Sequence, residues 1–185
     1  SFITASYPVD VILTKHFLSA EEAGNYAVLS LMGKIIFWLL TPIVNVMFPF
    51  SAREKTNFSK SLAFLKKSLL ITSGLGIPVL LAYILLPNLF LSILFPLYVN
   101  MAPYLGIFGA IMFITALSYL LINYHLAIKN TRIYLFPLIF FLIEVLLLWV
   151  FHSTIAQNIL IVGTVQTGLL FSLVAFTLLY IIKSR

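Results

Sequence analysis

Three ionisable side chains lie inside long apolar stretches of this sequence, where a charge is expensive. They are Asp10, Lys34 and Glu144. A charged group at the centre of a membrane helix costs roughly 2.5 to 3.5 kcal/mol on insertion scales, so such residues usually face the interior of a bundle or a wet cavity. We therefore treat them as candidate residues for binding an ion or a charged substrate.

Their spacing predicts that the three residues lie at a similar depth. Asp10 and Lys34 stand at equal sequence distances from Glu22, near the turn between two antiparallel helices, so the helical rise of about 1.5 Å per residue brings them to one level. Glu144 precedes Phe151 by roughly 10 Å on the same rise. The sequence predicts a polar cluster in which Lys34 can pair with either carboxylate. The alternatives are a fixed ion pair that locks two helices, and a protonated or interfacial Glu144.

Uncharged polar residues also interrupt the apolar runs. Each is more often a contact between helices than a ligand contact. We add Asn45 to the candidate binding residues. The other polar interruptions are Thr41, Ser118, Tyr119, Asn123, Tyr124 and Gln166.

The densest basic patch follows the second apolar run. It comprises Arg53, Lys55, Lys60, Lys66 and Lys67. Cytoplasmic loops of membrane proteins carry such residues, and they attract anionic lipid head groups. Direct binding of a phosphorylated ligand at the cytoplasmic mouth is the alternative function of this patch.

Catalytic motifs are absent from the sequence. It has no H-E-x-x-H, G-x-S-x-G, Walker A or G-x-G-x-x-G pattern. Three scattered histidines and five acidic residues lack the spacing of metal ligands, and there is no cysteine. We therefore predict no enzyme, no metal and no cofactor, and rank an intramembrane enzyme last.

The elements that position these residues are long apolar helices. Of the 185 residues, 62% are hydrophobic and only 9% are charged, with a mean hydropathy of +1.13. Residues 68–128 carry no Lys, Arg, Asp or Glu, and residues 133–182 carry only Glu144. A membrane span needs about 20 mostly apolar residues, so each stretch is long enough for two. The net charge of +6 belongs to loops and does not indicate nucleic acid binding.

We predict an all-α, polytopic membrane helical bundle of about six transmembrane helices in a single domain. Ser19 and Glu22 have the spacing of a capping box before the second helix. Pro42 and Pro49 predict a kink and a stop in that helix. Residues 89–95 are too few to span and predict an interfacial turn of helix. The predicted spans are 2–18, 26–50, 66–86, 104–128, 133–151 and 159–182.

The basic residues predict the orientation of the spans. Six alternating spans place residues 51–67, the loop 129–132 and the C-terminus on one side, with nine of the eleven basic residues. Short loops rich in Lys and Arg are cytoplasmic. We therefore expect a multi-pass membrane protein with a cytoplasmic C-terminus.

Several segments resemble polysaccharide flippases of the O-antigen and teichoic-acid type. Residues 9–27, VDVILTKHFLSAEEAGNYA, are similar to the opening of a lobe in that family, and residues 43–49 are similar to the end of its next helix. LFPLY at 94–98 and LAIKNTR at 126–132 resemble another recurring block. The matches cover about residues 9 to 132. Pro96 departs from the family, which often has Gly there.

The resemblance implies the multidrug/oligosaccharidyl-lipid/polysaccharide exporter superfamily. Its members have two lobes that move an undecaprenyl-diphosphate-linked saccharide across the cell inner (plasma) membrane by alternating access. This chain would supply one lobe, the C-terminal one, with the N-terminal lobe as a missing partner and a proton or sodium as coupling ion. The alternatives are a cation-coupled multidrug exporter of the same superfamily, and a membrane structural or assembly subunit that transports nothing.

Overall fold

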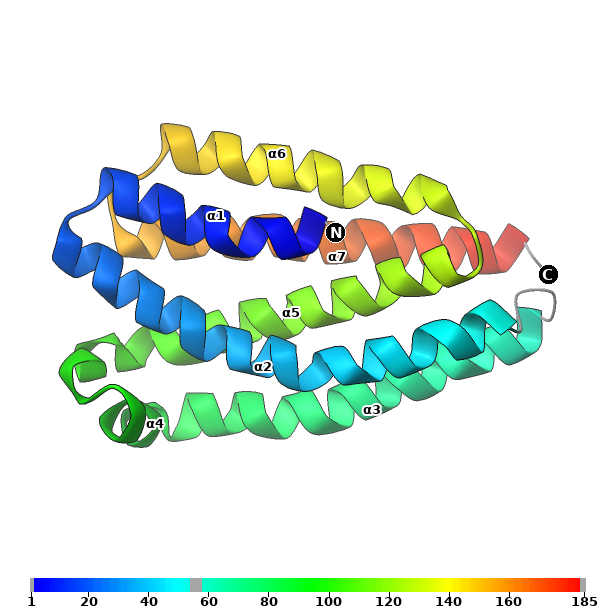
Figure 1. Ribbon diagram of the computed structural model, residues 1–185, viewed down its shortest axis with the longest axis horizontal. Helices are drawn as coiled ribbons and strands as arrows, with labels where there is room; N and C mark the ends of the chain where they lie inside the picture. Colours follow the sequence, from blue (N-terminus) through cyan, green and yellow to red (C-terminus); the bar gives the residue numbers. More distant parts are fainter. Residues whose placement is uncertain (1, 54–57, 184–185) are drawn as a thin grey trace.

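The computed structural model describes residues 2–53 and 58–183, with side chains from residue 9 onward in the first helix. Within these ranges every element is helical (Figure 1). The order of elements is α1 (Phe2–Phe17), α2 (Ala20–Arg53), α3 (Phe58–Leu85), α4 (Pro87–Leu94), η1 (Pro96–Met101), α5 (Ala102–Ala127), η2 (Thr131–Tyr134), α6 (Leu135–Val150) and α7 (Ile155–Lys183).

Among the residues that the structure describes, five helical stretches are long and apolar enough to cross a membrane: Ala20–Arg53, Phe58–Leu85, Pro96–Ala127, Thr131–Val150 and Ile155–Lys183. The first predicted span, residues 2–18, corresponds to α1, which has 16 residues and packs against α2 and α6. At the helical rise it is about 24 Å long. Its crossing of the whole bilayer therefore stays a prediction.

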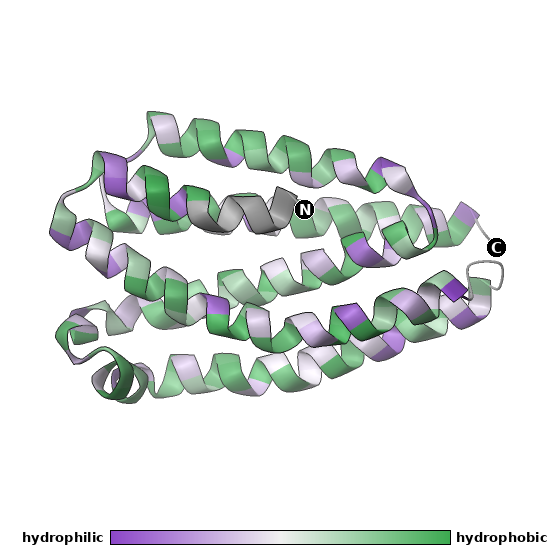
Figure 2. Ribbon diagram, in the orientation of Figure 1, coloured by the Kyte–Doolittle hydropathy of each residue, from purple (hydrophilic) through white to green (hydrophobic). Residues whose placement is uncertain are grey.

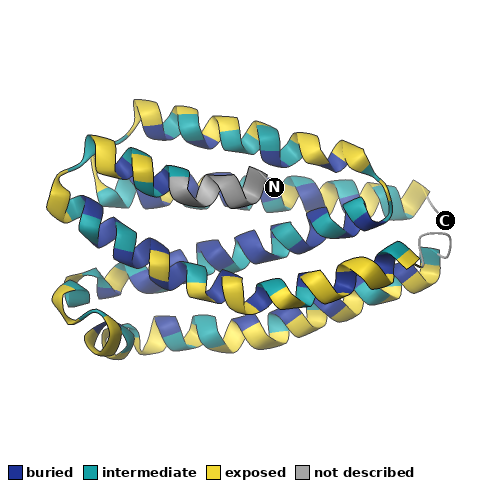
Figure 3. Ribbon diagram, in the orientation of Figure 1, coloured by how far each residue is buried: buried dark blue, intermediate teal, exposed yellow. Residues whose placement is uncertain are grey.

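The outward faces of the long helices are apolar, as Figures 2 and 3 show together. Leu70, Leu85 and Leu97, for example, are 76%, 73% and 91% exposed. A protein in water rarely exposes large continuous apolar patches, whereas lipid covers them without penalty. The chain is therefore an all-α, polytopic membrane helical bundle, as the sequence predicts.

The centre of the bundle is the pair α2 and α5. Helix α5 also packs against α3 and α7 (Figure 1). Gly33 allows the close approach of α2 to α5, because a Cβ there would lie 2.6 Å from the ring of Phe108 and 2.9 Å from Cγ of Met112. Tyr83 of α3 adds a buried hydrogen bond to the carbonyl of Met32, at 3.0 Å. Small residues at close crossings are typical of membrane helix packing.

The capping box is confirmed, but the boundary of the second helix is not. The Ser19 hydroxyl donates to Oε2 of Glu22 at 2.9 Å and accepts from the Glu22 amide at 3.3 Å. Helix α2 begins at Ala20, six residues before the predicted span, so Gly24 lies within the helix and not in a loop. A cap marks the start of a helix, whereas hydropathy marks only its apolar part.

The loop between α2 and α3 was predicted too long, for the same reason. Helix α2 continues through Pro49 to Arg53, so the stop predicted at that proline is wrong. Helix α3 begins at Phe58, eight residues before the predicted span. Both ends are turns of helix in which polar residues such as Arg53 and Lys60 interrupt the apolar pattern. Figure 1 shows that α2 bends between its two halves. Pro42, where a kink is predicted, is helical and lies in the second half. The predicted short apolar helix is confirmed as α4.

The alternating helices gather basic residues at one end of the bundle. The end of α2, the start of α3, the α5–α6 connection and the end of α7 lie together at the right of Figure 1. Arg53, Lys60, Arg132 and Lys183 belong to these termini. Lys55 lies outside the described residues. The location of this end in the cytoplasm stays a prediction.

Candidate functional site

Asp10 is the centre of a polar cluster inside the bundle. Asp10 belongs to α1 and is only 3% exposed. The hydroxyl of Tyr26 in α2 donates to Oδ2 of Asp10 at 3.0 Å, and the Val11 amide donates to Oδ1 at 2.8 Å. Tyr26 is itself fully buried. A side-chain contact between a carboxyl group and a phenol therefore joins the first two helices in the interior of the bundle.

Glu144 is the second buried carboxyl group. It lies on α6, is 3% exposed, and accepts a hydrogen bond from Nε2 of Gln166 in α7 at 3.1 Å. Glu144 and Asp10 interact electrostatically. Two carboxyl groups from α1 and α6 therefore share one low-dielectric region, in which the interaction between charges is stronger than in water.

Lys34 brings a cation to the same region. It is half-buried on α2, eight residues after Tyr26 and so close to the same face of the helix. Lys34 and Asp10 interact electrostatically. Asp10 thus interacts with both Lys34 and Glu144. The predicted choice of Lys34 between the two carboxylates stays a prediction.

A second polar contact lies one helical turn from Asp10. Nδ2 of Asn158 in α7 donates to the Thr14 hydroxyl of α1 at 3.0 Å, and both residues are buried. Oδ1 of Asn158 and Oε1 of Gln166 are buried without a hydrogen-bond partner among the described residues. Buried polar atoms are normally paired with protein or water. The two amide oxygens are therefore acceptors that a water or another donor could satisfy.

Asn45 does not belong to this cluster. It lies on α2, 11 residues beyond Lys34, and is exposed. At the helical rise this separation is about 16 Å along the axis. The prediction that placed Asn45 with the binding residues rested on its polarity alone, although only some polar residues of an apolar run face the bundle interior.

The basic patch is also remote from the buried charges. Arg53 ends α2, and Lys60, Lys66 and Lys67 are exposed on the first turns of α3. The structure places these four at the basic end of the bundle. Of the fifth predicted member, Lys55, it describes nothing.

Sequence reasoning did not assign the uncharged members of the cluster to the site. Thr14 follows Asp10 by four residues and Gln166 follows Asn158 by eight, so each pair lies on one face of its helix. That spacing was the available signal. Tyr26 gave no such signal, because its contact with Asp10 depends on how α1 crosses α2.

The fold and the cluster define a class: a multi-pass membrane helical bundle with ionisable groups in its interior. Comparisons with known protein families, curated proteins and solved structures find no match for this chain.

Proposed function

We propose that this chain forms one lobe of a membrane transporter that flips or exports a lipid-linked oligosaccharide or polysaccharide precursor by alternating access. The observation that supports it is the interior cluster of Asp10, Lys34 and Glu144. Ionisable residues inside a membrane bundle are expensive, and they are typical of substrate and ion pathways. The resemblance of residues 9–132 to polysaccharide flippases supports the choice of substrate.

The chemistry of the cluster suits such a substrate. A diphosphate-linked saccharide cannot cross hydrocarbon alone, because a buried unpaired charge is very costly. The ammonium group of Lys34 is a compact charge that can neutralise a phosphate oxygen. Lys34 is half-buried, whereas both carboxyl groups are buried, so the cation is the more accessible member. Asp10 holds Lys34 between turnovers and releases it when the phosphate arrives.

The balance of charges favours a second candidate, a cation-coupled multidrug exporter. The cluster contains two carboxyl groups against one lysine. A surplus of carboxyl groups inside a membrane suits the binding of a proton, a sodium ion or a cationic drug. In that case Asp10 and Glu144 carry the function and Lys34 only balances charge.

Transport assays of single variants test the proposal. In cells that express the protein, Lys34→Ala is expected to reduce export of the lipid-linked saccharide at least tenfold, the effect of about 1.4 kcal/mol. Lys15→Ala is the matched control, because Lys15 is exposed near the end of α1. Protein level and thermal stability are measured in parallel, so that misfolding is recognised.

The outcomes separate the candidates. Unaltered export by Lys34→Ala at normal protein level refutes the role of Lys34 in carrying the phosphate. Loss of cationic drug efflux in Asp10→Asn and Glu144→Gln, with efflux retained in Lys34→Ala, favours the multidrug exporter. Unchanged transport of both substrate classes in all three variants leaves the cluster a structural contact and contradicts both candidates.

A further inference from the structure

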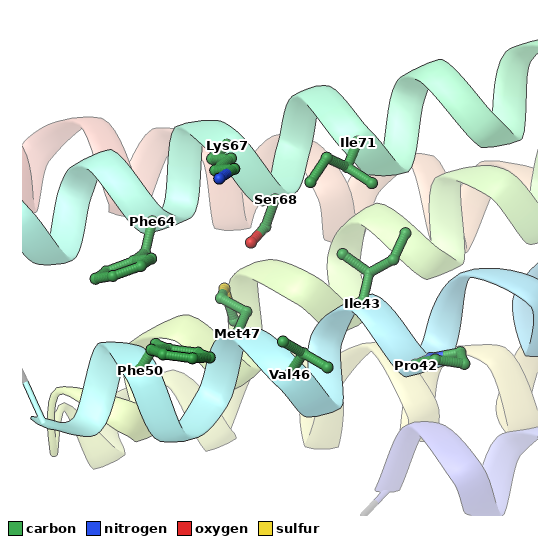
Figure 4. A pocket seen from close by; sticks show the side chains of 9 residues that line it. All are labelled: Pro42, Ile43, Val46, Met47, Phe50, Phe64, Lys67, Ser68 and Ile71. Carbon is green, nitrogen blue, oxygen red and sulfur yellow. The ribbon is translucent and has the colours of Figure 1, made fainter.

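Helices α2 and α3 leave an open groove between them on the half of the bundle that leads to the basic end. The groove has a volume of about 560 Å³. That volume lies within the range of ligand pockets, which is roughly 300 to 1,000 Å³. Figure 4 shows its side chains facing one another from the two helices. Lys67 and Ser68 are its polar residues, and the other seven lining residues are apolar.

The groove has one aromatic end and one aliphatic end. The rings of Phe50 and Phe64 stack across it, with centroids 5.4 Å apart and planes at 26°. Farther along, Ile43 of α2 faces Ile71 of α3 (Figure 4). The stack lies on the side of the basic end, so the aliphatic part of the groove extends toward the middle of the helices.

The two polar residues lie side by side on the α3 wall. Lys67 is exposed, whereas Ser68 is only 8% exposed. The Ser68 hydroxyl points from α3 toward Met47 of α2 in Figure 4, and it makes no hydrogen bond within the part of the chain that the structure describes. A hydroxyl that faces an open groove without a protein partner can donate a hydrogen bond to a ligand there. The groove therefore presents a cation and a free hydrogen-bonding group to whatever occupies it.

The depth of Lys67 matches the edge of a bilayer. From Lys67 to Leu85, the end of α3, the helical rise gives about 27 Å. The hydrocarbon core of a bilayer is about 30 Å thick. When this apolar part of α3 fills the hydrocarbon, Lys67 lies at the level of the phosphates, and Ile71 lies one turn below it, among the acyl chains.

We propose that this groove binds an anionic phospholipid of the bilayer. The lipid phosphate contacts the Lys67 ammonium group and accepts a hydrogen bond from the Ser68 hydroxyl, and one acyl chain lies along Met47, Ile43 and Ile71. The charge, the unpaired hydroxyl and the depth select a phosphate with an apolar tail. The inference does not depend on the proposed transport activity.

The neighbouring lysine supplies a matched control. Lys66 is exposed at the same depth, but it lines a different apolar groove, of about 320 Å³, between α3, α5 and α7. The hydroxyl in that groove belongs to Thr177, and it already donates to the carbonyl of Leu173 at 2.7 Å. A phosphate there would find a cation but no free hydroxyl. Removal of Lys66 changes the charge of the basic end by the same amount as removal of Lys67.

The test is lipid retention by the purified full chain. Native mass spectrometry counts the molecules of phosphatidylglycerol and of phosphatidylcholine, with the same acyl chains, that stay bound after release from detergent. Wild-type protein is expected to retain phosphatidylglycerol in preference to phosphatidylcholine. Lys67→Gln is expected to lower its affinity about fivefold, which corresponds to about 1 kcal/mol for one basic residue near an anionic lipid. Lys66→Gln is expected to leave it within twofold of wild type.

A second variant tests the apolar part of the groove. Val46 is 60% exposed and belongs to the α2 wall, so Val46→Trp fills the groove without disturbing the core. It is expected to lower retention of phosphatidylglycerol and to remove labelling of α2 and α3 by a phospholipid with a photoreactive acyl chain.

Four results would overturn the proposal. Equal losses in Lys66→Gln and Lys67→Gln would show general attraction to the basic end. Retention by Val46→Trp at the level of wild type would show that the acyl chain lies elsewhere. Displacement of phosphatidylglycerol by an equimolar polyprenyl phosphate would assign the groove to that lipid. Absence of photolabelling because a protein segment covers the groove would assign the groove to that segment.

Discussion

The hydrogen bond between Tyr26 and Asp10 offers the sharpest test of the polar cluster. Tyr26→Phe removes one oxygen atom and leaves the ring, which packs edge-to-face on Phe108 with centroids 5.6 Å apart. The substitution therefore creates no large cavity. Its effect isolates the contact between the phenol and Oδ2 of Asp10, which is 3.0 Å long.

Two magnitudes set the expected loss of stability. Hydrogen bonds to charged groups contribute about 1.5 to 3 kcal/mol in water-soluble proteins. Side-chain hydrogen bonds measured inside a membrane protein average about 0.6 kcal/mol, with a maximum of about 1.7. Asp10 keeps the amide of Val11 as a donor after the change, which limits the penalty. We therefore expect Tyr26→Phe to lower the free energy of unfolding by about 1.5 kcal/mol, roughly tenfold in the equilibrium constant.

Tyr83 provides the matched control. It is also buried, at 2% exposure, and its hydroxyl donates to the carbonyl of Met32 at the same distance, 3.0 Å. Its acceptor is a neutral backbone group, so Tyr83→Phe is expected to lower the free energy of unfolding by only about 0.6 kcal/mol. Unfolding by sodium dodecyl sulfate in mixed micelles, followed by helical circular dichroism, measures both variants.

A double-mutant cycle then assigns the energy to the pair. With Asp10→Asn as the second change, the coupling energy of Tyr26 and Asp10 is expected to be about 1 kcal/mol, because the two groups are in contact. A coupling energy near zero would refute the reasoning. So would a loss of stability in Tyr26→Phe that is no larger than the loss in Tyr83→Phe.

Two further predictions concern helix packing and the second carboxyl group. Gly76→Ala is expected to lower the free energy of unfolding by about 1 to 3 kcal/mol, because its Cβ would clash with the ring of Phe113. Gly74→Ala is expected to leave the free energy of unfolding unchanged or to raise it by up to about 1 kcal/mol, because no atom lies within 4 Å of the added Cβ. Equal thermal shifts in Gly76→Ala and Gly74→Ala would contradict this packing argument. Gln166→Leu removes the donor to Glu144 and is expected to lower the free energy of unfolding by about 1 to 3 kcal/mol, and an unchanged thermal midpoint would show that this bond contributes nothing.

The fold class could be predicted because the amino-acid composition determines it. Long stretches without charge allow few solutions other than membrane helices. The boundaries were harder, as α3 shows. Its first eight residues, from Phe58, lie outside the predicted span because the polar run Ser59, Lys60 and Ser61 interrupts them, yet they are helical. Hydropathy locates the hydrocarbon, whereas capping and neighbouring helices decide where a helix ends.

The candidate site could be predicted only in its charged members. Burial of a charge is so costly that Asp10 and Glu144 stand out in any apolar run. Whether an uncharged residue belongs to the site depends on the face of the helix that it occupies. Gln166 and Asn45 look alike in the sequence, yet the first is 7% exposed and bonds to Glu144, and the second is exposed on α2. The rotation of each helix about its axis separates them, and packing against the other helices sets that rotation.

The same contacts connect occupancy of the cluster with the position of α1. Among the side chains of α1 that the structure describes, the two buried ones are Asp10 and Thr14. Asp10 bonds to Tyr26 of α2, and Thr14 bonds to Asn158 of α7. Apolar surfaces gain little by leaving lipid, so these polar bonds weigh heavily in where α1 lies. A ligand shifts an equilibrium between conformations only by its difference in affinity for them. Asp10 both bonds to α2 and interacts with Lys34. A ligand that binds either residue therefore changes how strongly α1 is attached to the bundle. This gives the proposed transporter a physical link between ligand binding and helix movement.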